Sequence, residues 1–150
     1  MPEVSDLTTH IGYLLRMASN AVSHEFARKV AGEGVTVAEW AMLRSLYDSD
    51  VIAPSTLAVK MGMTKGAISK LAGRLLDKGL IGRRDTPGDK RGHGLFLSPS
   101  GRANVPVLAA LADRNDADFF AVLDGAAQEQ LRSALHRLIG KHGLTAMPLD

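Results

Sequence analysis

Apolar residues recur every three or four positions through much of the chain, which is the spacing of one face of an α-helix. This pattern predicts a long opening helix from Leu7 to Ala31. Two further helices are expected near the C-terminus, one with Ser98 as its N-cap and Pro99 in its first turn, and one after Asp124-Gly125. The apolar side of the former carries Leu108, Leu111, Ala112, Phe119, Phe120 and Leu123.

The middle of the chain begins with a capping box, in which two side chains satisfy free amides at a helix start. Thr36 and Glu39 have the required spacing. We therefore expect a second helix to begin here and to turn Trp40, Leu43 and Leu46 inward.

A helix-turn-helix pattern comes next. After a short extended stub at 51–53, Pro54 opens a third helix that runs to about Met61, and Gly62 marks a tight turn. A fourth helix then follows with Thr64 as its expected N-cap, and it should end at Gly79. Its apolar stripe consists of Ile68, Leu71, Leu75 and Leu76. The opposite face is left with short polar and basic side chains.

The next segment has the pattern of a β-hairpin. Residues 80–84 and 94–97 are strand-like, and they flank a basic loop that is rich in turn residues. Helix, glycine-containing turn, helix and basic hairpin is the order of a winged helix-turn-helix. The sequence therefore predicts a mainly α fold with a small β-hairpin wing.

The order of these elements divides the chain into a lobe and two flanks. We expect residues 1–150 to form one domain, with a winged helix-turn-helix lobe at about 36–98. Helices at about 6–31 and 99–143 lie outside this lobe. Their apolar faces are expected to be buried against another surface, since such faces rarely stay exposed over several hundred Å². We expect these terminal helices to pair in a homodimer and to bury their apolar faces there.

The composition agrees with a folded domain of ordinary size. The 150 residues are 45% hydrophobic and 23% charged, which is typical of a globular protein that can bury a core. The absence of cysteine excludes disulfides, thiolate metal sites and thiol nucleophiles. An acidic N-terminus and the lack of a long apolar run predict a cytoplasmic protein without a membrane span.

The charge is small in total but unevenly placed. The net charge is +2, yet residues 64–91 hold eight Lys and Arg against three Asp, which leaves +5 on this block and −3 on the rest. Such a block is typical of a surface that binds a polyanion, although charge imbalance alone favours an ordinary solvated face. Because the block coincides with the fourth helix and the hairpin, its position favours binding to double-stranded DNA.

A helix that enters the major groove needs short polar and long basic side chains on its exposed N-terminal turns. The expected contacts on the fourth helix are Thr64, Lys65, Ser69, Lys70 and Arg74. At the hairpin tip, Arg91 is expected to reach a minor groove, where negative potential is concentrated. Asp89 is expected to orient Arg91 through an ion pair, with Lys90 as a further contact.

These segments resemble a known family. Residues 57–71 (LAVKMGMTKGAISKL) and 74–81 (RLLDKGLI) are similar to the helix-turn-helix of MarR-type (multiple antibiotic resistance regulator) transcription factors. Residues 89–92 (DKRG) and 97–101 (LSPSG) are similar to that family's wing and the start of its fifth helix. The resemblance implies a homodimer whose first, fifth and sixth helices interlock and whose two lobes bind a pseudo-palindromic operator.

The resemblance also implies a sequence-specific transcriptional regulator, for which a repressor is the expected mode and an activator stays open; neither an enzymatic activity nor a cofactor is expected. It implies a small aromatic effector, held in a crevice between the dimer helices and the lobe, that releases the DNA. The candidate lining residues are Tyr13, His24, Phe26 and Trp40. For each of them, ordinary core packing is the alternative.

Two other functions stay open from the residues. One is a winged-helix module whose basic face binds an acidic protein, and the other is a ligand-binding or metal-binding protein without a DNA function. No metal site is expected within one chain, because the five His residues lack helical metal spacing, but a site assembled across a dimer stays open. Phosphate-loop, dinucleotide and nucleophile-elbow motifs are absent, so an enzyme has no candidate residues.

Overall fold

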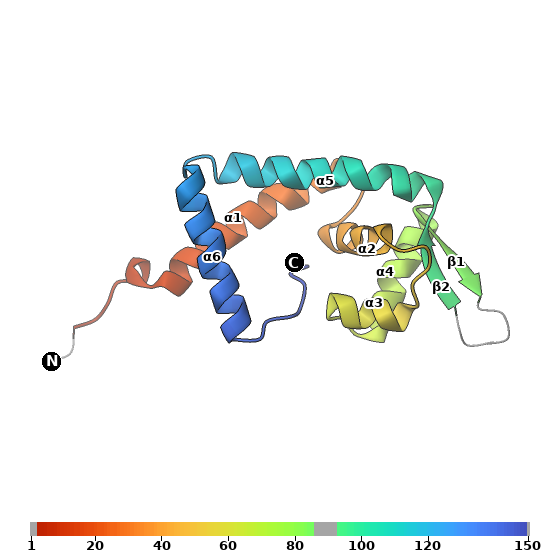
Figure 1. The fold of residues 1–150 in the computed structure, drawn as a ribbon, viewed down its shortest axis with the longest axis horizontal. Coiled ribbons are helices and arrows are strands. Elements are labelled where there is room, and N and C mark those ends of the chain that lie inside the picture. Colours follow the sequence, from red (N-terminus) through yellow and green to blue (C-terminus); the bar gives the residue numbers. More distant parts are fainter. Residues whose placement is uncertain (1–2, 86–92, 150) are drawn as a thin grey trace.

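The computed structural model of the chain describes residues 3–85 and 93–149. In that part of the chain there are six α-helices, one 3₁₀ turn and an antiparallel pair of strands, so the predicted fold class is confirmed. Figure 1 shows α2, α3, α4 and the hairpin gathered at one end, with α1, α5 and α6 extending away from them. The elements are η1 (Leu7–Thr9), α1 (Ile11–Ala31), α2 (Val37–Tyr47), α3 (Pro54–Met61), α4 (Lys65–Asp77), β1 (Ile81–Asp85), β2 (His93–Leu97), α5 (Pro99–Phe119) and α6 (Gly125–Lys141).

The lobe is built around one apolar core, to which α2, α3, α4 and the hairpin all contribute. The predicted capping box starts α2: Glu39 N donates to Thr36 Oγ1, and Thr36 N donates to Glu39 Oε1, both at 3.1 Å. Fully burying one large aliphatic side chain contributes about 1.5–3 kcal/mol, so this cluster dominates the stability of the lobe. Its most buried members in these elements are Met42, Leu43, Leu46, Leu57, Met61, Ile68, Leu71, Leu75 and Leu95.

The hairpin is attached to this core by a third short extended segment. β1 and β2 are antiparallel, with Ile81 opposite Leu97. Ile52, in the stub predicted at 51–53, exchanges two backbone hydrogen bonds with Leu95, at 2.9 and 2.8 Å. The base of the hairpin is therefore fixed to the lobe.

The start of α5 packs closely against the end of α4 and the start of β1. Ser98 Oγ accepts from Gly101 N at 3.1 Å, which confirms the predicted N-cap, and it donates to the carbonyl of Gly79 at 2.6 Å. A Cβ atom at Gly101 would lie 1.9 Å from the carbonyl oxygen of Leu80, so only glycine permits this approach. The lobe is thereby joined rigidly to the long helix that leaves it.

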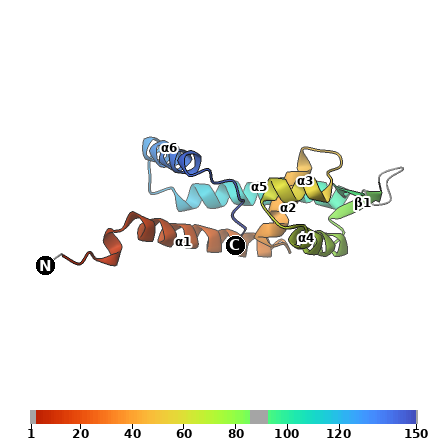
Figure 2. The ribbon, with the colours of Figure 1, turned by 90° about the horizontal axis from the view of Figure 1, so that it is seen from below.

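α1 and α5 run side by side in opposite directions (Figures 1 and 2). A buried polar residue fixes their register: Asn115 of α5 is 5% exposed, and its amide donates to the carbonyl of Val22 at 3.2 Å. Lys29 Nζ donates to Asn115 Oδ1 at 2.9 Å. A buried polar group without partners would be costly, so these two bonds define one arrangement of the pair.

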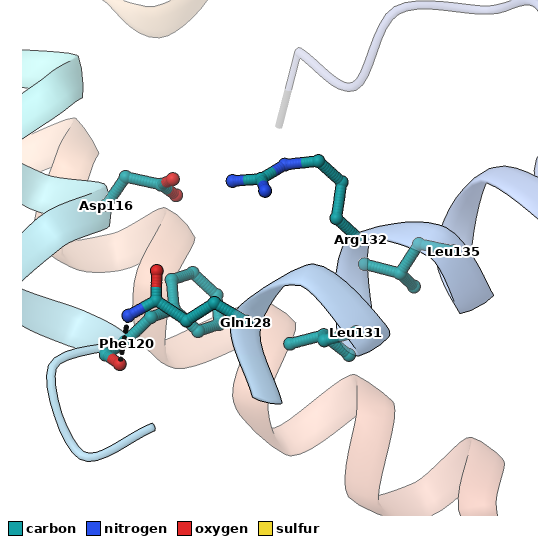
Figure 3. A pocket seen from close by; sticks show the side chains of 6 residues that line it. All are labelled: Asp116, Phe120, Gln128, Leu131, Arg132 and Leu135. Carbon is teal, nitrogen blue, oxygen red and sulfur yellow. Dashed lines mark hydrogen bonds between the residues drawn. The ribbon is translucent and has the colours of Figure 1, made fainter. Parts of the chain in front are cut away.

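α6 turns back from the end of α5 at a corner shown in Figure 3. The Gln128 amide donates to the carbonyls of Phe120 and Leu123, both at 3.0 Å, and so satisfies groups that the end of α5 leaves free. A small pocket of about 170 Å³ lies at this corner, where Asp116 and Arg132 face each other. The two hydrogen bonds of Gln128 thus connect α6 to the end of α5, beside the pocket at this corner.

The terminal helices leave apolar faces uncovered. Among residues 11–31 only Val30 is buried, and none of residues 125–141 is buried. Several large apolar side chains on these helices are highly exposed, from 43% for Ile139 to 80% for Ile11. They are Ile11, Leu14, Leu15, Met17, Leu138 and Ile139.

Three sequence predictions were wrong in detail. The opening helix begins at Ile11, because Leu7–Thr9 form a separate 3₁₀ turn that Thr9 N closes on the carbonyl of Asp6, and His10 is extended (ψ 126°) and interrupts the helix. α5 ends at Phe119, which places Phe120 and Leu123 in the corner where Gln128 binds their carbonyls. Trp40 was expected to point inward but is only half-buried, since it packs against the edge of the core and also borders a cavity.

Gly73→Ala is expected to stabilise the protein by about 0.5–1 kcal/mol, because glycine inside a helix costs that much relative to alanine. A methyl group at Gly73 would meet no atom of the described chain within 4 Å. Thermal unfolding followed by circular dichroism should show a rise of a few degrees. A lower melting temperature would contradict the free space that the structure shows beside Gly73.

Candidate nucleic-acid interface

The turn between α3 and α4 is set by one glycine and one threonine. Gly62 takes a left-handed conformation (φ 65°, ψ 32°) that L side chains rarely adopt, and it ends α3. Two residues later Thr64 Oγ1 accepts a hydrogen bond from Ala67 N at 3.1 Å, which confirms the predicted N-cap of α4. The two helices therefore form a helix-turn-helix in which α4 occupies the second position.

α4 presents two chemically different faces. Ile68, Leu71 and Leu75 are at most 1% exposed and hold the helix on the core. All five of the predicted contact residues on this helix are exposed, so they share the solvent side. The ion pairs found in residues 3–85 and 93–149 involve other cations, which leaves the basic groups of this face available to an anion. These five residues are Thr64, Lys65, Ser69, Lys70 and Arg74.

The predicted wing contacts Asp89, Lys90 and Arg91 lie outside the described residues. In the adjoining strand pair, the Arg84 guanidinium lies over the Phe96 ring, 5.5 Å from its centroid. A Cβ at Gly82 would overlap that ring, at 2.4 Å, so the glycine makes room for Phe96. Sequence reasoning missed this stacked arginine, although a glycine paired with an aromatic residue in a hairpin was a usable signal.

A second basic cluster surrounds Tyr47 at the end of α2. Arg44 and Arg102 lie on its ring, 5.7 and 5.3 Å from the centroid, and Arg102 also donates to the Tyr47 carbonyl at 3.3 Å. Arg44 pairs with Asp48 at 2.8 Å, and this hydrogen bond lowers the pKa of the exposed Asp48 carboxyl. The cluster joins the end of α2 to the start of α5.

A large crevice separates α1 from the lobe. Its volume is about 730 Å³, which is enough for a small organic ligand. One wall is formed by α1 through Asn20, Ser23, His24, Phe26, Ala27 and Ala31, and the other by the start of α2 through Thr36, Val37, Trp40 and Ala41. The C-terminal tail closes one side with Met147, Pro148 and Leu149. The lining is mainly apolar.

Three of the four predicted crevice residues, His24, Phe26 and Trp40, are brought together around this cavity. Tyr13 is not among its lining residues, and it precedes His24 on α1 by 11 residues, about 16 Å of helix. The contribution of the tail was missed, because no local pattern indicates where residues 147–149 fold back.

Within residues 3–85 and 93–149, no group of three or more His, Cys, Asp or Glu side chains is arranged to hold a metal ion. No described helix combines the length and the apolar character that crossing a membrane requires.

The sequence model of the MarR family matches residues 33–92, which include the helix-turn-helix and the first strand of the hairpin. A putative transcriptional regulatory protein for the hcr operon of Thauera aromatica is 33% identical over 129 residues, covering 85% of this chain and 78% of that protein. The crystal structure of a probable transcriptional regulator from Pseudomonas aeruginosa has a TM-score of 0.78 at 34% identity, covering 89% of this chain and 100% of the other.

A MarR family protein of Mycobacterium tuberculosis, solved in complex with salicylic acid, has a TM-score of 0.67 at 26% identity and covers 86% of this chain and 96% of the other. These relatives are described as regulators and not as enzymes. The capped helix-turn-helix, the hairpin, the long flanking helices and this likeness lead to one assignment: the chain belongs to the MarR family of transcriptional regulators.

Proposed function

We propose that two copies of this protein form a dimer that binds a pseudo-palindromic DNA operator, with one α4 in each of two successive major grooves. The observation that carries the proposal is the exposed face of α4, where polar and basic residues lie together on a helix that its apolar side fixes to the core. In this assignment Thr64 and Ser69 read base edges or phosphates, and Lys65, Lys70 and Arg74 supply positive charge.

The proposed division of labour follows the chain. Residues 36–98 form the DNA-binding lobe of one domain, and the helices at about 6–31 and 99–143 join the two copies. The uncovered apolar faces of α1 and α6 support this division. Asp89, Lys90 and Arg91 are assigned to the wing, which follows the stacked Arg84 and would contact an adjacent minor groove.

DNA binding is tested by selecting genomic fragments with the purified protein and titrating the enriched sequence against a shuffled duplex. We expect a specific dissociation constant about 1,000-fold or more below that for the shuffled duplex, the usual lower limit for a sequence-specific regulator. Equal, salt-sensitive binding to both duplexes would instead favour a module whose basic face meets an acidic protein.

We further propose that the crevice binds a small aromatic acid that lowers operator affinity. Its mainly apolar lining, with Trp40 on one wall and His24 on the other, supports this ligand class, as does the salicylate complex of the M. tuberculosis relative. Coupling of about 1–3 kcal/mol between the two sites would weaken operator binding about 5- to 150-fold. The operator-bound dimer is proposed to act as a cytoplasmic repressor. In vitro transcription from the promoter that contains the selected operator tests this role.

The effector proposal has a built-in reporter, because Trp40 is the only tryptophan of the chain. Salicylate is expected to change Trp40 fluorescence saturably and to raise the operator dissociation constant by about fivefold or more at saturation. His24→Ala should weaken the fluorescence response, while Tyr13→Phe, outside the crevice lining, should leave it unchanged. A response that does not saturate, or one without an effect on DNA, would contradict this assignment.

A further inference from the structure

An ion pair between a buried carboxylate and a partly exposed lysine joins the C-terminal end of α4 to the start of α2. Lys78, the C-cap residue of α4, places its Nζ 2.7 Å from Glu39 Oε2. The Glu39 side chain is 1% exposed and that of Lys78 is 39% exposed. Lys78 Nζ also donates to the carbonyl of Gly34 at 2.8 Å. The lysine belongs to the basic block, but its ammonium group is already engaged within the protein.

Both oxygens of the Glu39 carboxylate have partners. Oε2 accepts from Lys78, and Oε1 accepts from the backbone N of Thr36 in the capping box. Desolvation on burial raises the pKa of Glu39, but the hydrogen bonds from Lys78 and Thr36 outweigh it and leave the pKa below its usual value. The carboxylate is therefore ionised at neutral pH and fixed at the junction of the two helices.

The pair lies at the end of α4 opposite the proposed DNA contacts, so a small change in the direction of the helix would move those contacts. α4 has 13 residues, and at 1.5 Å per residue it is about 20 Å long. Its exposed N-terminal turns lie at one end, and Lys78 lies at the other. A change of about 5° in the direction of α4 would displace its first turn by nearly 2 Å relative to its C-terminal end, at the scale where a positioned site loses its geometry.

We propose that Glu39 and Lys78 are positioning residues for DNA recognition: their ion pair holds the C-terminal end of α4 so that its N-terminal turns meet the operator in register. The inference rests on the proposed DNA-binding function. In it, Lys78 contributes to specific binding through Glu39 and not through a phosphate. Thr36 belongs to the same cap and lines the crevice, so the pair lies between the crevice wall and α4.

Glu39→Gln separates positioning from plain electrostatics. It removes a negative charge from the lobe, so electrostatics alone predicts equal or tighter binding to any DNA. Loss of the ion pair instead predicts a rise of about tenfold in the operator dissociation constant, within the range usual for coupled positions. The dissociation constant for a shuffled duplex should stay within about twofold of the wild type or fall. Fluorescence anisotropy with both duplexes measures the two constants.

A second variant protects the test against a folding defect. Glu39→Gln/Lys78→Met has the net charge of the wild type and leaves no buried charge unpaired, a replacement that proteins often tolerate. It should show the same selective loss of operator binding, with circular dichroism melts confirming that it is folded at the titration temperature. Its salt dependence should match the wild type, whereas loss of a phosphate contact in each copy would reduce the slope by about 1.8 per dimer.

Glu33→Gln is the matched control, since it neutralises an exposed glutamate in the turn between α1 and α2, close to Glu39 in sequence but outside the pair. It should leave the operator preference unchanged. If the folded single and double variants at Glu39 keep the wild-type preference, or lose both duplexes in parallel, the positioning role is overturned. If the wild type itself shows no preference for the operator, the proposed function fails first and the positioning role with it.

Discussion

Ile11→Glu/Leu14→Glu is expected to convert the protein to a monomer that binds the operator on the order of 100- to 10,000-fold more weakly than the wild type. Both side chains lie on the uncovered face of α1, 80% and 49% exposed in a single copy. In the proposed dimer this face is buried, and burying unpaired carboxylates costs several kcal/mol each. In a dimer, binding of the first lobe holds the second lobe at a high effective concentration near its own half-site. A monomer lacks this effect, and its usual size gives the expected 100- to 10,000-fold loss of operator affinity.

Light scattering after size exclusion gives the mass of each variant, and anisotropy titration gives its affinity. Ile11→Leu/Leu14→Met is the control, because it keeps the face apolar at nearly the same volume and should stay dimeric with unchanged affinity. The melting curve of the Glu variant should retain a cooperative transition, since the lobe core does not include these residues. A dimeric Glu variant would show that the two copies meet elsewhere.

Lys65→Ala/Lys70→Ala has the second-largest expected effect, a loss of operator affinity on the order of 100-fold at moderate salt. Both lysines lie on the exposed face of α4, where their ammonium groups are free to meet phosphates. A dimer would lose four such contacts. The slope of log affinity against log salt should therefore decrease by about 3 to 4, at about 0.9 per phosphate on B-DNA.

The matched control for this variant is Arg114→Ala/Lys141→Ala, which removes the same number of exposed positive charges from α5 and α6. It should keep both the wild-type affinity and the wild-type salt slope, provided that its mass is still that of a dimer. A slope that is unchanged in Lys65→Ala/Lys70→Ala, or equally reduced in the control, would remove α4 as the phosphate-contacting element.

Local sequence predicted the features that depend on near neighbours. Thr36, Thr64 and Ser98 each cap a helix by binding a backbone amide three residues away, so the relevant partners are visible in the sequence. The αL turn at Gly62 and the inward stripe of α4 belong to the same class. These features determine which face of α4 is exposed to solvent. They explain why the five predicted contact residues lie on the same exposed face.

Features that depend on distant partners were not predictable in the same way. Glu39 was visible as a cap, but its ion pair with Lys78 joins residues 39 positions apart. The bonds of Asn115 to α1 span even longer separations. The tail that closes the crevice has no periodic pattern, and the resemblance placed Tyr13 with His24 in the crevice although helix geometry separates them.

Sedimentation of the protein mixed with a labelled operator duplex tests the central claim most directly. The account predicts a complex of two chains on one duplex at micromolar protein, formed in a single cooperative step, with no such complex on a shuffled duplex of equal length. A single chain on the operator, or identical sedimentation with both duplexes, would contradict it.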